Sequence, residues 1–473
     1  MTGPADSEPP PATSATPAPP RLRRVLGLWD LVFYGIVLIQ PLGGVGIFGW
    51  ANKDSLGHVT TAMLIALVAM MLTALSYGRM AGLYPVAGSA YTYVGRGLNP
   101  HLGFIAGWTM FFDYLVIPVL SVVYGAISVQ QLLDDVLPGV TQKMISHLGF
   151  AVEPQHAWIV LFVVVSTVLN VRGIKWTAHA NYILTAVMFV VIAIFVVDAM
   201  RFLGWGGIFS TAPFYNPHTF NLSGLGTATS LAAVTYVGFD GITTLAEDVR
   251  EPKRTVPFAI MLVCVVIGIC ALLQTYFGQL VWPDYNTYKD LDTAFYDVCK
   301  MVGGKFLFDS IILTMAVASL GTTLTGQVGA ARILFGMGRD NALPRFFARL
   351  DRRNNPVLNI CLIGAVVMAA ALLLKYEGAV ELVNFGAFLA FMGVNAAVIR
   401  EFFFRPPPGH KRNWFYDLVI PALAFLFCLW IWWMLKPAAK IVGGIWCGLG
   451  LIYTGIKTRG FTRQPVMLDL SGS

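Results

Sequence analysis

The stretch QPLGGVGIFGW, residues 40–50, interrupts an apolar segment that is otherwise long enough to cross a membrane. Pro41 has no backbone N–H to donate within a helix, and the glycines that follow it weaken helical structure further. In lipid, unwound backbone is tolerated only where protein buries it or where it lines a cavity. The sequence therefore predicts a helix over 29–50 that is broken near its middle for a functional reason.

The rest of the chain is equally apolar. Of its 473 residues, 56% are hydrophobic and 12% are charged, and the mean hydropathy is +0.68, a composition typical of integral membrane proteins. Hydrophobic stretches of about 18 residues or more recur along the sequence. We predict an all-α integral membrane protein whose twelve transmembrane helices cover residues 29–50, 59–83, 102–131, 156–171, 177–203, 225–247, 256–281, 306–333, 357–374, 379–404, 414–435 and 440–457.

The distribution of positive charge predicts the orientation in the membrane. Lys and Arg gather in alternate loops, above all at 21–24 and 339–353, so both termini should lie in the cytoplasm and the cell membrane should hold the protein. These loops account for the net charge of +7 without a nucleic acid partner. Residues 1–24 are rich in Pro, Ala, Ser and Thr and predict a disordered cytoplasmic tail.

A second predicted helix, 225–247, is interrupted like the first, by Gly238 and Gly241 on either side of Phe239 and Asp240. Five crossings separate the starts of the two interrupted helices, and because five is odd, they enter the membrane from opposite sides. Paired discontinuous helices of this kind are typical of transporters built from inverted repeats, and their gaps hold the substrate. The predicted organisation is a tail over 1–24, a transport core over 25–405, two further helices over 406–460 and a cytoplasmic tail over 461–473.

The first gap has the chemistry of a substrate site. Loss of helix there leaves backbone N–H groups at the positive end of a half-helix, which suits a carboxylate, and glycine lets a ligand approach closely. The alternative is that the glycines only allow helices to pack closely. The residues predicted to contact substrate in this gap are Pro41, Gly43, Gly44, Val45 and Gly46.

Two carboxylates lie within predicted spans, where an acidic residue marks an ion or substrate pathway. Asp240, in the second gap, can take up a proton from one side of the membrane and release it to the other, and it can also cap the resumed half-helix. Asp113 either binds a substrate ammonium group or accepts a hydrogen bond from a neighbouring Tyr or Ser. If both face one cavity, a diamine or a cationic amino acid is favoured; if only one does, a neutral amino acid.

Aromatic side chains beside these groups can close over a substrate and offer a π face to an amine. Tyr114 follows Asp113, and Tyr236 and Phe239 flank the second gap next to Gly238. Aromatic residues make up 13% of the chain, so packing in the core or against lipid is the alternative for each. We predict that Tyr114, Tyr236, Gly238 and Phe239 contribute to substrate binding together with Asp113.

Four motifs extend these observations: GGVGIFG (43–49), YGRMAGLYPVAGSAYTYVGRGLNP (77–100), YVGFDGITTLAEDVREPKRTVP (236–257) and AARILFGMGRDNALPRFFARL (330–350). Together they resemble the amino acid, polyamine and organocation (APC) superfamily of secondary transporters. The resemblance implies the five-plus-five inverted repeat of the leucine-transporter fold, with helices 1 and 6 broken and an amino acid or polyamine moved by alternating access. GWTMFFDYLVIPVLSVVYG (107–125) looks closest to the putrescine-importer branch, as does PLGGVGIFG (41–49), which stands where many amino acid carriers have a Gly-Ser-Gly core.

The coupling ion is left with two candidates. Some proton-coupled members that the chain resembles carry a Lys in helix 5, where this sequence has Met188, so proton coupling is assigned to Asp240 instead. Sodium would need oxygen ligands from the first gap and from hydroxyls of the eighth helix, where Thr322 and Thr323 are available. We expect a proton, in symport or exchange, with a sodium-coupled amino acid carrier as the alternative.

Other classes of function have no support in the sequence. The six Cys and seven His are dispersed without metal-ligand spacing, so we expect no metal and no cofactor. No nucleotide-binding loop or hydrolase motif is present, so we expect no enzyme. A ligand sensor that keeps a transporter fold stays open, and the sequence leaves the oligomeric state undecided.

Overall fold

The computed structural model describes residues 26–85, 89–139, 153–173, 178–339, 343–351, 355–460 and 462. The predicted tail over 1–24 and almost all of the tail over 461–473 lie outside these ranges. Within them every regular element is a helix, and the β-type contact is an isolated parallel bridge between Leu26 and Val249.

The helices follow one another along the described chain with short connections. The α-helices are α1 (Leu28–Ile39), α2 (Gly43–Asp54), α3 (Val59–Leu83), α4 (Ser89–Gly97), α5 (Pro100–Val136), α7 (Pro154–Val171), α8 (Ala178–Gly207), α9 (Leu222–Ala232), α10 (Pro252–Val281), α11 (Ala294–Arg339), α12 (Val357–Leu373), α13 (Tyr376–Val398), α14 (Ile420–Met434) and α15 (Pro437–Lys457). Tighter 3₁₀ turns form η1 (Ala233–Tyr236), η2 (Phe239–Asp248), η3 (Tyr285–Thr287) and η4 (Arg345–Ala348), and wider π turns form η5 (Ile399–Phe404) and η6 (Phe415–Val419).

The lengths of these helices identify a multi-pass membrane protein. In the described part of the chain, ten helices are long and apolar enough to cross a membrane, and the bent pair α1 and α2 gives an eleventh if it crosses as one span. The helix α12 is also apolar but has 17 residues. A helix satisfies its own backbone hydrogen bonds, which is why chains cross lipid in this form.

Predicted and observed bounds agree for some spans and differ for others. The predicted span 59–83 coincides with α3. The helix α5 is longer than the predicted 102–131, because Pro100 occupies its first turn and the Asn99 side chain accepts a hydrogen bond from the N–H of His101 at 2.8 Å. The helix α11 also begins before the predicted 306–333, and its extra turns are set off by a kink at Gly304 (φ 62°).

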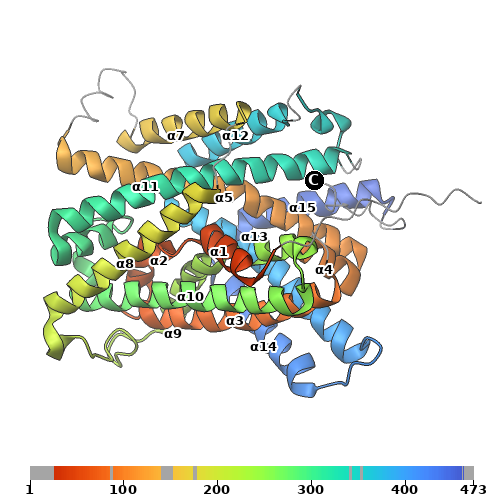
Figure 1. Cartoon of the computed structure of the whole chain (residues 1–473), viewed down its shortest axis with the longest axis horizontal. Coiled ribbons are helices and arrows are strands. Elements are labelled where there is room, and N and C mark those ends of the chain that lie inside the picture. Colours follow the sequence, from red (N-terminus) through yellow and green to blue (C-terminus); the bar gives the residue numbers. More distant parts are fainter. Residues whose placement is uncertain are drawn as a thin grey trace, which may run out of the picture.

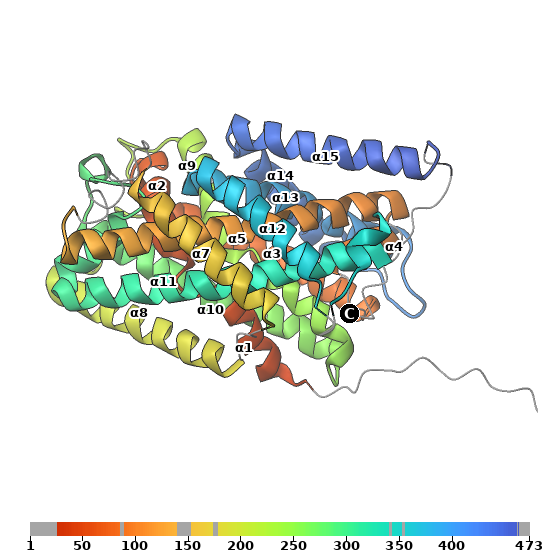
Figure 2. The same cartoon turned by 90° about the horizontal axis from the view of Figure 1, so that it is seen from above.

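The long helices lie side by side along one direction, which is horizontal in Figure 1. The helices α5 and α11 pack along each other through the middle, α3 packs along α10 on one side of them, and α7 packs along α12 on the other (Figures 1 and 2). The half-helix α1 packs against α10 and η2, and α2 packs against α9 and α10. The gap between them, at Pro41 and Leu42, is buried, whereas α1 exposes Trp29 and Phe33 on its outer side.

The helix α15 is attached to α5 by a reciprocal pair of tryptophans. The indole N–H of Trp108 donates to the backbone carbonyl of Trp446 at 2.9 Å, and that of Trp446 donates to the carbonyl of Trp108 at 3.1 Å. The two rings stack with their centroids 4.8 Å apart. Each partly buried indole thus has a polar partner for its N–H.

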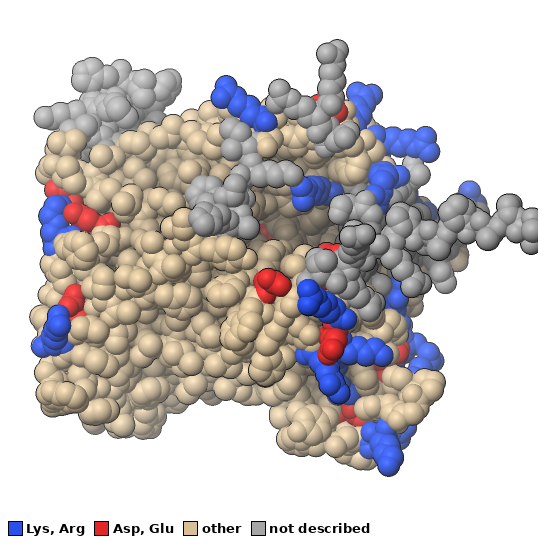
Figure 3. All heavy atoms as spheres, in the orientation of Figure 1, with Lys and Arg blue, Asp and Glu red and all other residues tan. Residues whose placement is uncertain are grey.

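The two ends of the bundle differ in charge. We call the end where α1 begins and α15 ends the terminal end, and the other the opposite end. On the face drawn in Figure 3, Lys and Arg gather toward the terminal end, at the right, and the middle of the face is almost free of charge. An uncharged middle between charged ends is the surface that a protein crossing a bilayer requires.

Candidate functional site

The helices α1 and α2 meet at an angle of 47° across the gap between them. Gln40 has a φ of 68°, a left-handed conformation uncommon for residues other than glycine, and Pro41 follows it. Two N–H groups at the start of α2 are used locally: Gly43 donates to the carbonyl of Gln40 at 3.2 Å, and Val45 to that of Leu42 at 3.0 Å. These two donors, which the sequence assigned to a substrate carboxylate, are therefore occupied in this conformation.

Two glutamine side chains hold the gap. The amide nitrogen of Gln274, on α10, donates to the carbonyl of Pro41 at 2.8 Å. The side chain of Gln40 reaches in the other direction and donates to the hydroxyl of Thr322 on α11. Because a buried carbonyl without a partner is unfavourable, the amide of Gln274 stabilises the unwound turn.

The glycines of α2 face side chains at close range. A methyl group would lie 2.3 Å from the Tyr376 hydroxyl if placed at Gly46, 3.1 Å from the Thr235 methyl if placed at Gly43, and 3.4 Å from the Gln274 amide oxygen if placed at Gly44. Val45 is also buried. In this conformation the glycines allow close packing, which was the alternative to an open approach for a ligand.

The second gap lies directly against the first. The helix α9 gives way to η1, then to the extended residue Val237 and to Gly238, whose φ of 117° favours glycine, before η2 begins. The hydroxyl of Thr235 donates to the carbonyl of Gly43 at 3.5 Å. A methyl group at Gly238 would lie 3.5 Å from the side chain of Ile39. The two interrupted segments thus touch where each loses α-helical structure.

Asp240 stands in the first turn of η2 and is partly exposed. Its carboxylate accepts a hydrogen bond from the hydroxyl of Ser89 at 3.3 Å, and Ser89 begins α4 with a φ of 45°. The backbone carbonyl of Asp240 accepts from the Thr243 hydroxyl at 2.6 Å. The carboxylate is therefore directed at the first residue of α4, on another part of the chain.

Asp113 is buried within α5, and one of its carboxylate oxygens has no hydrogen-bond partner among the described residues. It lies so close to α13 that a methyl group at Gly386 would be 2.2 Å from that oxygen. Asp113 and Asp240 interact electrostatically with each other, and both also interact electrostatically with the hydroxyls of Tyr77 and Tyr114. The two carboxyl groups that the sequence singled out therefore share one neighbourhood.

Aromatic rings surround this neighbourhood in different ways. Phe239 is fully buried, stacks on Phe391 with centroids 5.1 Å apart, and meets the edge of Tyr77 at 5.2 Å. Tyr236 is also buried, and its hydroxyl donates to a carbonyl of α3 at 3.2 Å. Tyr114 is partly buried and packs against α11. Phe239 is thus part of a packed cluster, and Tyr236 is fixed to α3.

The threonines predicted for a sodium site are both engaged. The Thr322 hydroxyl accepts from Gln40, and the Thr323 hydroxyl donates to the carbonyl of Ser319 on its own helix at 2.8 Å. Across the residues that the structure describes, no three His, Cys, Asp or Glu side chains come together as metal ligands. Met188, at the helix 5 position, is buried.

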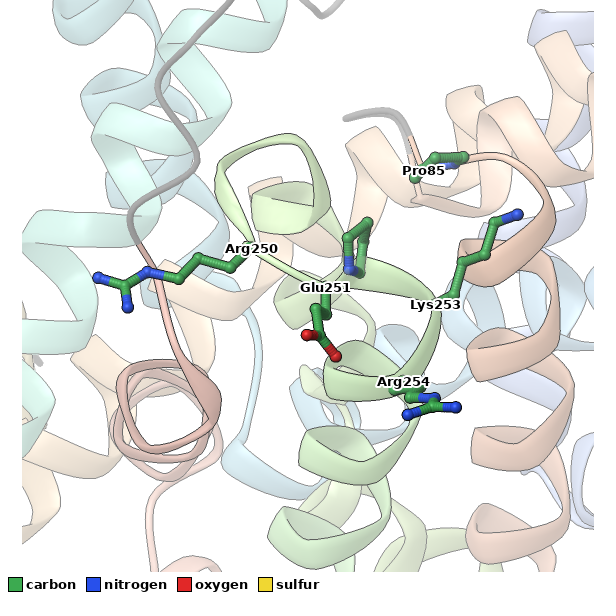
Figure 4. Close-up of a pocket in the computed structure, with 6 residues that line it drawn as sticks. Pro85, Arg250, Glu251, Lys253 and Arg254 are labelled. Atoms are coloured by element: carbon green, nitrogen blue, oxygen red, sulfur yellow. The ribbon is translucent and has the colours of Figure 1, made fainter.

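A surface hollow of about 350 Å³ lies at the terminal end and is lined by Pro85, Arg250, Glu251, Pro252, Lys253 and Arg254. Figure 4 shows Arg250 and Arg254 extending in opposite directions from it. A small-molecule site needs polar groups that converge on one ligand. The hollow does not compete with the paired gaps as the candidate site.

Several polar side chains outside the predicted site residues form hydrogen bonds at or near the two gaps. Gln274 and Gln40 hold the first gap, Ser89 contacts Asp240, and Asn384 on α13 donates to the carbonyl of Ser230 on α9 at 2.5 Å. Gln274 and Asn384 are isolated amides in apolar stretches, which is a signal for an interhelical hydrogen bond. Their partners could be found only from the three-dimensional structure.

Known proteins of one family are similar to almost the whole chain. Residues 28–450 match the model of the family described as amino acid permease. The low-affinity putrescine importer PlaP of Escherichia coli (strain K12) is 32% identical over 452 residues, which cover 94% of this chain and 96% of that protein. The branched-chain amino acid permease BcaP of Lactococcus lactis subsp. cremoris is 26% identical over 407 residues, 84% of this chain and 85% of that protein.

Proposed function

Because the chain belongs to the amino acid permease family, we propose that it is a secondary transporter that carries an amino acid or a polyamine across the membrane by alternating access. The observation that supports this most is the contact of the two helix gaps at Thr235 and Gly43, with Asp240 in the second gap and with Asp113, buried on α5, holding a carboxylate oxygen without a partner among the described residues. Neither forms a salt bridge within the described residues. A substrate ammonium group supplies the missing cation.

Two carboxyl groups favour a substrate with more positive charge than a neutral amino acid. An ammonium at each end of a diamine can meet Asp113 and Asp240 in turn, and the aromatic rings nearby stabilise such cations. The relative named as a putrescine importer makes putrescine the first substrate to try. The residues that we assign to substrate are Pro41, Gly43, Gly44, Val45, Gly46, Asp113, Tyr114, Tyr236, Gly238 and Phe239.

We assign the helices to a five-plus-five inverted repeat. In this assignment α1 and α2 form broken helix 1, and α9 with η1 and η2 forms broken helix 6. The helix α12, in spite of its 17 residues, completes the twelve spans. The space beside Gly46, in the first turn of α2, is filled by the Tyr376 hydroxyl in this conformation. We assign substrate entry to another state of the cycle, in which Tyr376 withdraws.

Proton coupling is assigned to Asp240, which is partly exposed in the second gap and whose carboxylate accepts a hydrogen bond from Ser89 at 3.3 Å. Sodium stays the alternative: the Thr322 hydroxyl accepts from Gln40, but the Thr323 hydroxyl donates to the Ser319 carbonyl and keeps its oxygen lone pairs for an ion. The gathering of Lys and Arg at the terminal end (Figure 3) supports cytoplasmic termini in a cell-membrane protein.

Counterflow of radiolabelled putrescine into proteoliposomes tests the proposal. The wild type should exchange putrescine intact, Asp113→Asn should lower diamine exchange more than exchange of a neutral amino acid, and Asp240→Asn should abolish proton-driven accumulation while sparing some exchange. Asp309→Asn, at an exposed site on α11, is the matched control and should behave as wild type. Binding without exchange would identify a sensor, and a changed molecule would identify an enzyme; either result refutes transport.

A further inference from the structure

A cluster of charged residues lies at the opposite end of the bundle, away from the paired gaps. Asp54 ends α2, Glu377 and Glu381 lie in the first turns of α13, and Lys436 precedes α15. Trp50, one turn before Asp54, adds an aromatic face. We call these residues the Lys436 cluster. They join three segments that are far apart in the sequence.

The side chain of Lys436 is held from several directions. Its ammonium forms a salt bridge with Glu377 and lies 3.7 Å from a carboxylate oxygen of Asp54. The ammonium also lies 5.6 Å from the centre of the Trp50 ring, within the range of a cation–π interaction. Two carboxyl groups and one ring thus face a single primary ammonium group.

The carboxyl groups have more capacity than Lys436 uses. Glu381 is 2% exposed; one of its oxygens accepts the backbone N–H of Lys436 at 3.0 Å, and the other has no hydrogen-bond partner among the described residues. The Asp54 oxygen that faces Lys436 is likewise without a hydrogen bond. A buried acceptor without a partner is unfavourable, so these oxygens can take additional N–H donors.

The aromatic wall of the cluster is fixed in place. The indole N–H of Trp50 donates to a carboxylate oxygen of Asp292 at 2.7 Å. Asp292 belongs to the connection between α10 and α11, which packs so closely that a methyl group at Gly49 would lie 2.3 Å from the carbonyl of Leu291. The ring face is therefore held toward Lys436.

The other charges nearby do not neutralise the cluster. Lys53 attracts Asp54 electrostatically, and Lys375 attracts Asp292 in the same way. Within the described residues, however, these two lysines form no salt bridge with Glu377 or Glu381. Burial lowers the pKa of Lys436, but its hydrogen bond to Glu377 and the attraction of Asp54 outweigh this and raise that pKa above its ordinary value. Lys436 therefore stays charged.

We propose that Asp54, Glu377, Glu381 and Trp50 form a second binding site, for a primary alkylammonium ion, and that the side chain of Lys436 fills this site when no ligand is bound. The site is separate from the paired gaps and does not depend on the transport function proposed above. A ligand that displaces the Lys436 ammonium breaks its salt bridges with Asp54 on α2 and Glu377 on α13, whereas the hydrogen bond from the Lys436 backbone N–H to Glu381 stays. The chemical class is a primary amine on an unbranched alkyl chain, because that is the chemistry of the lysine side chain that occupies the site.

Removal of the tethered competitor is the direct test. A tethered group competes at a high effective concentration, so Lys436→Met, which keeps the stem and removes the ammonium, should tighten binding of n-butylammonium to the purified protein about tenfold or more. Isothermal titration calorimetry measures this change. The gain should be lost in the double variants Lys436→Met/Glu377→Gln and Lys436→Met/Glu381→Gln, whereas binding at the paired gaps contributes equally to all of these proteins.

Lys440→Met is the matched control, because Lys440 is a nearby lysine whose ammonium donates to the carbonyl of Trp433 instead. It should leave n-butylammonium affinity unchanged. If Lys436→Met does not elute as a folded species in size-exclusion chromatography, Lys436→Gln repeats the comparison with a polar neutral side chain. Unchanged affinity on removal of the ammonium, a gain that survives both glutamate substitutions, or an equal gain in Lys440→Met would overturn the proposal.

Discussion

Gln274 offers the sharpest test of whether the unwound turn at Pro41 matters for substrate. The side chain is 1% exposed, and its amide nitrogen donates to the carbonyl of Pro41 at 2.8 Å and to that of Cys270 at 2.9 Å. Gln274→Leu keeps a similar volume and removes the donor. The carbonyl of Cys270 lies within α10, so the main loss falls on Pro41, which sits in the gap.

The size of the effect follows from leaving one buried carbonyl without its partner, which costs about 1–3 kcal/mol. If substrate binds only when the turn has the shape seen here, that free energy is subtracted from binding. A loss of about 1–3 kcal/mol lowers the apparent affinity roughly 5- to 150-fold. The amide oxygen of Gln274, 3.4 Å from where a methyl group at Gly44 would lie, disappears in the same substitution.

The assay is equilibrium binding of radiolabelled putrescine to purified protein, together with the melting temperature. Gln279→Leu is the matched control: it lies on the same helix, is also buried, and donates its amide to the carbonyl of Gly57, outside the gap. Both variants should melt at lower temperature, but only Gln274→Leu should lose affinity. Equal losses of affinity in the two variants, or a folded Gln274→Leu that binds as wild type, would refute the reasoning.

Three further outcomes are expected. Gly386→Ala should lower putrescine affinity as Asp113→Asn does, because a methyl group there would lie 2.2 Å from the Asp113 carboxylate; unchanged binding in a titration would remove Asp113 from the site. Burial raises the pKa of Asp292 to about 6, although Trp50 donates a hydrogen bond to it. The pKa of an Asp in the unfolded chain is near 4, so between about pH 4 and 6 the folded protein keeps a proton that the unfolded chain has released. Melting temperature should therefore fall as pH rises from about 4 to 6, and Asp292→Asn should flatten this part of the curve; an unchanged slope contradicts the assignment. Replacing sodium by choline should leave putrescine uptake within about twofold in the wild type and in Thr323→Val, because coupling is assigned to a proton at Asp240; dependence on sodium would favour the sodium-coupled carrier.

The sequence was most informative where a single residue controls the local backbone. Proline and glycine act within a turn or two, so the interruptions at Pro41 and Gly238 could be located without any knowledge of neighbouring helices. Hydrophobic length similarly indicated a helical multi-pass protein, and α3 has the predicted bounds, whereas the described residues hold ten membrane-length helices, or eleven with the pair α1 and α2, against the twelve predicted. Extensions such as those of α5 and α11 were underestimated, because hydropathy measures the apolar part of a helix and not where the helix ends.

The contacts of the site depended on packing that no local pattern encodes. No residue near Gly46 in the sequence indicates that the Tyr376 hydroxyl fills the space beside it. Similarly, no residue near Pro41 indicates that the amide of Gln274, 233 positions away, donates a hydrogen bond to the Pro41 carbonyl. Asp113 and Asp240 were selected because acidic residues are rare in membrane spans. Their electrostatic interaction became evident only with the helices in place, and their roles in transport stay predictions.

The reciprocal tryptophans of α5 and α15 bear on how the chain is built in the cell. Trp108 and Trp446 are 338 positions apart, and synthesis proceeds from the N-terminus. The ribosome therefore delivers α5 long before α15, and until then the Trp108 indole N–H lacks the carbonyl that it meets in the folded protein. Attachment of α15 to α5 is thus a late step, and a polypeptide halted before Trp446 would leave the Trp108 indole without this partner.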